Sequence, residues 1–250
     1  KTPYYPEFHL PKQIQDQIIF GQTIDINHPA ARKLLDLDQK IVLELSKYDN
    51  IAYWQVENEP LLSNINNNKI APNLIAAEVD IVRKTDPLKR PVILSHVGPS
   101  VFDNKWKNLL PILNPGDIFG VNAYFKTQGV NLMEFKLFNQ EYKLPWPKGF
   151  VWPVQSWPLL SPNYENIKKQ VEARGNRLWI MEMQADPYIR TLNDANKEHF
   201  YFNTRDVLNA DEFLRHDRIS SIGFWGSSFW LYRKSIGDNG WLDTVFQIVK

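Results

Sequence analysis

Short apolar runs alternate with longer amphipathic stretches along the chain. Five apolar runs bounded by turn-forming or charged residues predict buried strands: 50–58 (NIAYWQVEN), 90–98 (RPVILSHVG), 117–125 (DIFGVNAYF), 177–184 (RLWIMEMQ) and 218–226 (RISSIGFWG). Between them, apolar residues spaced three or four positions apart predict helices over 29–48, 73–84 and 164–174, and Gly175 is a natural stop for the last one. Repeated strand-then-helix order predicts a parallel sheet with helices outside it.

Two architectures fit this alternation, a doubly wound sheet and a closed barrel. No glycine-rich phosphate-binding motif of the GxGxxG or GxxxxGK[ST] kind follows any of the five runs, which weakens the nucleotide-binding, doubly wound alternative. We therefore predict an α/β fold of the TIM (β/α)8 barrel type, with residues 1–250 forming a single domain.

One segment departs from the alternation. Residues 141–163 (EYKLPWPKGFVWPVQSWPLLSPN) are rich in proline and predict a long loop without regular secondary structure. They contain Trp146, Trp152 and Trp157, which could pack on one another or stack against the flat faces of sugars. Both interpretations stay open, and we expect at least one of the three, with Trp152 and Trp157 as the main candidates, to contact a ligand.

Composition and charge narrow the class of partner. With 43% hydrophobic residues the chain can bury a large core, and its 29 basic and 28 acidic residues leave a net charge of only +1. Such a balance favours neither nucleic acid nor an anionic membrane surface, so we expect an uncharged partner. No apolar run approaches the roughly 18 residues of a membrane span. Cysteine is absent and the five histidines lack the HExxH spacing, so we expect no metal and no other cofactor.

Two glutamates stand where predicted strands end. Glu59 is the last residue before Pro60, and Glu182 lies near the end of 177–184, ahead of Pro187. In a parallel barrel the active site forms at these strand ends, and a pair of carboxyl groups is what hydrolysis of a glycosidic bond requires. Glu57 shares the strand parity of Glu59 and is expected to point inward, one layer deeper, in a structural hydrogen-bonding role.

The segments WQVENEP (54–60) and LWIMEMQADPY (178–188) resemble the strand-four and strand-seven signatures of the clan A glycoside hydrolases. These are retaining (β/α)8 enzymes that include cellulases, mannanases and β-galactosidases. The resemblance implies that Glu59 is the acid/base and Glu182 the nucleophile, and that Asn58 hydrogen-bonds the sugar 2-hydroxyl. It leaves the identity of the sugar open.

Further positions of the resemblance concern the substrate. Tyr124 in VNAYF matches the tyrosine that holds the nucleophile, and Asn122 stands where many family members have histidine. Trp225 in GFWGSSFW matches the tryptophan that forms the floor of the cleaved subsite, with Trp230 as the alternative. His9 could line the same cleft or be a structural histidine.

The resemblance also assigns numbers to the predicted strands. If Glu59 ends strand four, the chain holds strands four to eight, and the barrel is N-terminally incomplete. Strands one to three would lie upstream of Lys1, where a signal or membrane anchor would also have to stand if the protein is secreted or belongs to the cell envelope. The sequence leaves the compartment open.

The sequence therefore predicts a retaining glycoside hydrolase that acts on a β-linked oligo- or polysaccharide. The alternative is a carbohydrate-binding protein on the same scaffold that no longer turns over substrate. A serine hydrolase is disfavoured because WGSSF (225–229) lacks the second glycine of the GxSxG turn that exposes a nucleophilic serine.

Overall fold

A computed structural model describes residues 14, 16–63, 68–98, 104–128, 131–137, 140–145, 151–153, 162–187, 189, 192–198 and 201–250. Between residues 127 and 153 it describes the backbone only. All statements below concern these residues.

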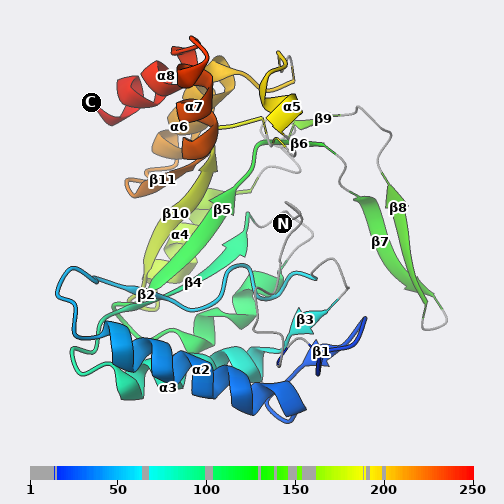
Figure 1. Cartoon of the computed structure of the whole chain (residues 1–250), viewed down its shortest axis with the longest axis vertical. Coiled ribbons are helices and arrows are strands. Elements are labelled where there is room, and N and C mark those ends of the chain that lie inside the picture. The colour runs from blue at the N-terminus through cyan, green and yellow to red at the C-terminus, as the bar shows by residue number, and fades with distance from the viewer. Residues whose placement is uncertain are drawn as a thin grey trace.

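A five-stranded parallel sheet forms the centre of the molecule (Figure 1). Its strands lie in the order β2 (Trp54–Gln55), β4 (Val92–Val97), β5 (Ile118–Ala123), β10 (Arg177–Gln184) and β11 (Ile222–Trp225). The order in space is the order in the chain, so each crossover leads to the next strand along. All five strands predicted from the apolar runs are confirmed, and so is the α/β class.

The prediction of a TIM (β/α)8 barrel is wrong for the described structure. The sheet curls into a partial barrel but stays open, because in the described residues β2 pairs only with β4 and β11 only with β10. A closed barrel of this type needs about eight strands, whereas this sheet has five. The edge strand β2 is also very short, since the chain leaves the extended conformation at Glu57, whose φ is +59°.

Helices pack at both ends of the sheet. The three predicted helices are confirmed with ends shifted by a few residues, as α2 (Pro29–Leu45), α3 (Pro72–Thr85) and α4 (Tyr164–Glu172). The others are α5 (Leu192–Ala195), α6 (Thr204–His216), α7 (Ser227–Ser235), α8 (Gly240–Val249) and the 3-10 helices η1 (Lys105–Asn108) and η2 (Leu110–Ile112). In Figure 1, α2 and α3 lie together at the bottom, and α6, α7 and α8 lie at the top.

Three two-stranded pairs accompany the sheet. They are β1 (Thr23–Ile24) with β3 (Lys69–Ile70), β6 (Lys126–Gln128) with β9 (Val151–Pro153), and β7 (Asn131–Leu137) with β8 (Gln140–Pro145). The β7–β8 hairpin stands away from the sheet in Figure 1.

The prediction that 141–163 has no regular structure is therefore wrong in part, because β9 and all but the first residue of β8 fall within it. Pro145 and Pro153 are the last residues of β8 and β9, where a missing N–H interrupts no further ladder. Of the three tryptophans in this segment, Trp152 lies in β9 with its backbone described, and Trp146 and Trp157 lie outside the described residues.

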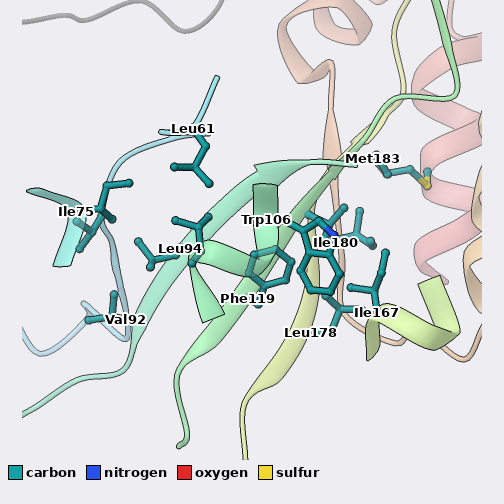
Figure 2. Close-up of a cluster of buried hydrophobic side chains, with 14 of the residues drawn as sticks. Leu61, Ile75, Val92, Leu94, Trp106, Phe119, Ile167, Leu178, Ile180 and Met183 are labelled. Carbon is teal, nitrogen blue, oxygen red and sulfur yellow. The ribbon is translucent and has the colours of Figure 1, made fainter. Parts of the chain in front are cut away.

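One face of the sheet is buried under the helices. Figure 2 shows Leu94 of β4, Phe119 of β5 and Ile180 of β10 meeting side chains from helices, including Trp106 of η1. The rings of Trp106 and Phe119 lie 5.5 Å apart. Burying a side chain of this size stabilises the fold by about 1.5 to 3 kcal/mol. Strand alternation then turns every second side chain to the opposite face.

Candidate active site

Polar side chains lie on the face of the sheet opposite the helices, near the carboxyl ends of the strands. Ser95 pairs in register with Gly120, and Val97 with Asn122. All four alternate with the core residues of their strands, so they occupy the face opposite the helices. Ser95 and Asn122 are nevertheless fully buried, which requires hydrogen-bonding partners for their polar atoms.

A β-bulge brings Glu182 onto the same face. Ile180 of β10 pairs with Val121, but Glu182 pairs with Asn122, so Met181 is an extra residue in the ladder. The pairing of β10 with β11 shifts at the same place. Regular alternation from Ile180 would have turned Glu182 toward the helices, and the bulge turns it toward Asn122 instead.

Two glycines on the neighbouring strands make room for this bulge. A Cβ atom on Gly120 of β5 would lie 2.5 Å from Cγ of Met181. A Cβ atom on Gly223 of β11 would lie 2.7 Å from the carbonyl oxygen of Met181. Real Cβ atoms do not approach other atoms so closely, so both strands need glycine where they flank the extra residue.

Tyr124 holds Glu182 in place. Its hydroxyl donates a hydrogen bond of 2.6 Å to Oε2 of Glu182. Burial raises the pKa of Glu182 above its usual range, and the bond from Tyr124 acts in the opposite direction. A hydroxyl donor favours the ionised carboxylate, the form that can act as a nucleophile.

Glu59 reaches the site from the short edge strand. The N–H of Val56 still donates to the carbonyl of Ile93, at 3.0 Å, as a strand residue would. Glu57 and Glu59 then adopt left-handed backbone conformations, with φ values of +59° and +50°. For residues other than glycine, such conformations cost about 1 to 3 kcal/mol each and cluster at functional sites.

The carboxyl group of Glu59 lies across β4, beside β5. Its Oε1 accepts a hydrogen bond of 2.8 Å from Nδ2 of Asn122, and its backbone N–H donates to Oγ of Ser95 at 3.3 Å. Burial raises the pKa of Glu59 to about 7, with Asn122 lowering it and the charge of Glu182 raising it further. The two glutamates therefore act on each other electrostatically, although they come from strands at different places in the sheet.

Asn58 is oriented by its neighbours. Its Oδ1 accepts hydrogen bonds from Oγ of Ser95 at 3.1 Å and from Nε2 of Gln55 at 3.3 Å. Nδ2 of Asn122 lies 3.5 Å from the same oxygen. Because the oxygen faces these donors, the amino group is the part of Asn58 that can donate to a ligand.

The two candidate tryptophans differ in exposure. Trp225, at the end of β11, is 39% exposed and shares the face of Gly223. Trp230 of α7 is only 7% exposed, its Nε1 donates to the carbonyl of Ala185 at 2.7 Å, and its ring packs edge-on against Phe224. Trp225 therefore offers an accessible ring, whereas Trp230 packs in the interior.

Glu57 lies in an acidic cluster beside the helices and not one layer deeper on the inner face, as the strand parity suggested. Its left-handed backbone turns it away from Glu59, into electrostatic contact with Asp38 of α2 and Glu78 of α3. Burial raises the pKa of all three groups, to about 7 for Asp38 and about 9 for Glu78. We call Asp38, Glu57 and Glu78 the acidic cluster.

Sequence reasoning missed several of these residues. Asp38 stands four positions from both Leu34 and Val42, so a charge interrupts the apolar stripe of α2. Glu78 does the same in α3, and this pattern could have pointed to the acidic cluster. Ser95 and Gln55 gave no comparable signal, because their roles depend on cross-strand neighbours.

The remaining predicted site residues fall outside what the structure describes. His9 and Trp157 lie outside the described residues, and the side chain of Trp152 is not described. In the described part of the chain, no group of three or more His, Cys, Asp or Glu residues could hold a metal ion. No helix in that part is both long and apolar enough to cross a membrane.

No protein-family model matches the chain, and no curated protein matches it. Function is therefore inferred from the residues of the site and from the motifs that contain them.

Proposed function

We propose that the protein is a retaining glycoside hydrolase that cleaves a β-linked oligo- or polysaccharide, with Glu182 as nucleophile and Glu59 as acid/base. The observation that carries this proposal is the pairing of two carboxyl groups in unlike environments. Glu59 is 3% exposed, bonded to an amide and has a pKa of about 7, whereas Glu182 is less buried and bonded to a tyrosine hydroxyl. When two neighbouring carboxyl groups have environments that push their pKa values apart, the one with the higher pKa can act as the acid and the other as the ionised partner.

In the first step, the carboxylate of Glu182 attacks the anomeric carbon while Glu59 gives its proton to the leaving oxygen. The glycosidic bond breaks and a glycosyl ester forms on Glu182. That ester carries no negative charge, so the part of the raised pKa of Glu59 that comes from the charge of Glu182 is removed, while the part that comes from burial remains. Glu59 can then accept a proton from water, which attacks the anomeric carbon and releases Glu182 with overall retention.

Two further residues suit the binding of a sugar. The amino group of Asn58 can donate to a hydroxyl beside the scissile bond, because its oxygen is already occupied. The exposed ring of Trp225 can stack on a sugar face. Trp152, Trp157 and His9 stay candidates for more distant substrate contacts.

The test uses aryl β-glycosides with good and poor leaving groups. Glu182→Gln should abolish turnover of both, and Glu59→Gln should impair poor leaving groups far more than activated ones, since only the former need the proton. Glu172→Gln, an exposed change on α4, is the matched control and should leave rates unchanged.

NMR of the first product formed should show the retained anomer. Initial release of the inverted anomer, or equal loss of both substrate types in Glu59→Gln, would overturn the assignment.

One observation favours a carbohydrate-binding protein without turnover as the second candidate. The described sheet is open, so its polar face is not enclosed as it would be in a closed barrel. Saturable binding of oligosaccharides with no product released, and binding unaffected by Glu182→Gln, would support this candidate.

A further inference from the structure

Asn122 donates a side-chain hydrogen bond to the carboxyl group of Glu59. It comes from the inner face of β5, is 0% exposed, and donates through Nδ2 to Oε1 of Glu59 at 2.8 Å. Its Oδ1 is buried and accepts no hydrogen bond from any residue that the structure describes. A buried oxygen without a hydrogen-bond donor is unfavourable for stability, so the presence of asparagine at this position needs an explanation.

We infer that Asn122 is a positioning residue for Glu59: its amide keeps Oε1 as a hydrogen-bond acceptor, so the exchangeable proton is confined to Oε2. This inference rests on the acid/base role proposed for Glu59. An oxygen that already accepts from an N–H donor is the poorer site for a proton, so the proton binds the other oxygen. Oε2 is then the atom that gives the proton to the leaving group and later takes one from water.

The neutrality of the amide matters as much as its geometry. Glu59 must be protonated in one step and ionised in the next, and an amide N–H can donate to Oε1 in both states. A cation at the same place would hold Glu59 ionised, and a second carboxylate would hold it protonated. Asn122 avoids both outcomes.

The other groups around Glu59 do not provide this contact. Ser95 of β4 is neutral and bonds the backbone of Glu59, while Asn58 bonds Ser95 and Gln55. Glu182 of β10 is the charged group that acts on Glu59, and it acts by repulsion. Other titratable side chains nearby face elsewhere: His96 of β4 lies on the helix side of its strand, and Glu57 faces the acidic cluster.

The experiment compares Asn122→Leu and Asn122→Asp with the wild type. Loss of the donor should raise the pKa of Glu59, so the alkaline limb of the kcat/KM profile should move to higher pH by about one unit or more in Asn122→Leu. Asn122→Asp also adds a like charge and should move it further. Rates should fall about tenfold or more for poor leaving groups and less for activated aryl glycosides, because only the former depend on the placed proton.

A matched control is Ser95→Ala, which touches the backbone of Glu59 but not its carboxyl group. It should leave the alkaline limb in place. Unshifted limbs in both Asn122 variants, or a rate loss equal for both leaving-group types, would overturn the inference.

A second readout does not depend on activity. In protein with ¹³C-labelled glutamate carboxyl groups, the Glu59 resonance is identified by its loss in Glu59→Gln and titrated by NMR. Its midpoint should rise in Asn122→Leu and stay unchanged in Ser95→Ala. If the protein proves inactive but the midpoint rises, the proposed function fails while the contact of Asn122 with Glu59 stands. If the enzyme is active and the midpoint is unmoved, the positioning role fails alone.

Discussion

Glu59 and Glu182 lie in unlike environments, although burial raises the pKa of both carboxyl groups. Glu59 meets a neutral amide in a buried place, while Glu182 meets a hydroxyl at 2.6 Å and is less buried. The roles proposed for the two glutamates follow from the motif residues of WQVENEP and LWIMEMQADPY. The donors were only partly predictable: Tyr124 was expected to hold Glu182, but Asn122 was expected to line the site for substrate and instead contacts Glu59.

Tyr124→Phe tests the hydrogen bond to Glu182. The tyrosine hydroxyl favours the ionised carboxylate, so its removal should raise the pKa of Glu182 and move the acidic limb of the kcat/KM profile to higher pH. A hydrogen bond to a charged group is worth about 1.5 to 3 kcal/mol, which corresponds to roughly 10- to 100-fold in rate. The alkaline limb, which belongs to Glu59, should move less. An unchanged acidic limb would mean that Tyr124 does not act on the ionisation of Glu182.

At the scale of the element, the bulge in β10 is the feature that periodicity could not reveal. The run RLWIMEMQ identifies a strand correctly, but its regular alternation would turn Glu182 to the helix side. The residues that indicate the bulge lie in the neighbouring strands β5 and β11, where Gly120 and Gly223 leave space for Met181. Likewise, the antiparallel pairings of β8 and β9 with strands outside the proline-rich segment were not visible within it.

Substitution of the two glycines separates their roles in the bulge. Gly120→Ala should destabilise the protein by about 1 to 3 kcal/mol and lower kcat, because its Cβ overlaps Cγ of Met181. Adding Met181→Ala removes that atom, so the double variant should recover stability relative to the sum of the two single changes. Gly223→Ala clashes with the backbone of Met181, and Met181→Ala should not rescue it. Urea midpoints and kcat of the five variants measure this, and additive effects for Gly120 with Met181 would contradict it.

At the scale of the whole molecule, alternating strands and helices determine the class of fold more firmly than its closure. The pattern indicates parallel strands joined by crossovers, and the observed sequential strand order agrees with it. Whether such a sheet closes depends on the number of strands and on the pairing of the first strand with the last. The spacing of apolar residues within single strands and helices carries no information on that pairing. The assignment to the TIM (β/α)8 type, with three strands expected upstream of the chain, was therefore the part of the fold prediction that failed. The position of the site at the carboxyl ends of the strands does not depend on closure.

The balance of buried carboxyl groups sets how stability depends on pH. Asp38, Glu59 and Glu78 have pKa values raised to about 7, 7 and 9, chiefly by burial. Each stabilises the folded state fully below its unfolded pKa, and this contribution is lost as pH rises through the folded pKa.

Asp86 behaves in the opposite way. Burial alone would raise its pKa, but hydrogen bonds from the backbone and from Trp54, together with Arg90, lower it overall, so its contribution is lost as pH falls below its unfolded pKa.

Stability should therefore be greatest near pH 5 and decrease toward pH 9. Urea unfolding at pH 5, 7 and 9 should show a falling midpoint. Glu78→Gln should flatten this fall over the whole range from pH 5 to 9, because burial raises the pKa of Glu78 to about 9 and the amide cannot ionise. Glu59→Gln should flatten only the part between pH 5 and 7, whereas the exposed change Glu172→Gln should leave the curve as it is. The gain at pH 9 in Glu78→Gln should be on the order of a few kcal/mol, since each unit of pKa shift corresponds to about 1.4 kcal/mol and Asp38 and Glu57 share the repulsion. A midpoint that stays constant or rises from pH 5 to 9 would show that the acidic cluster is not held protonated by the fold.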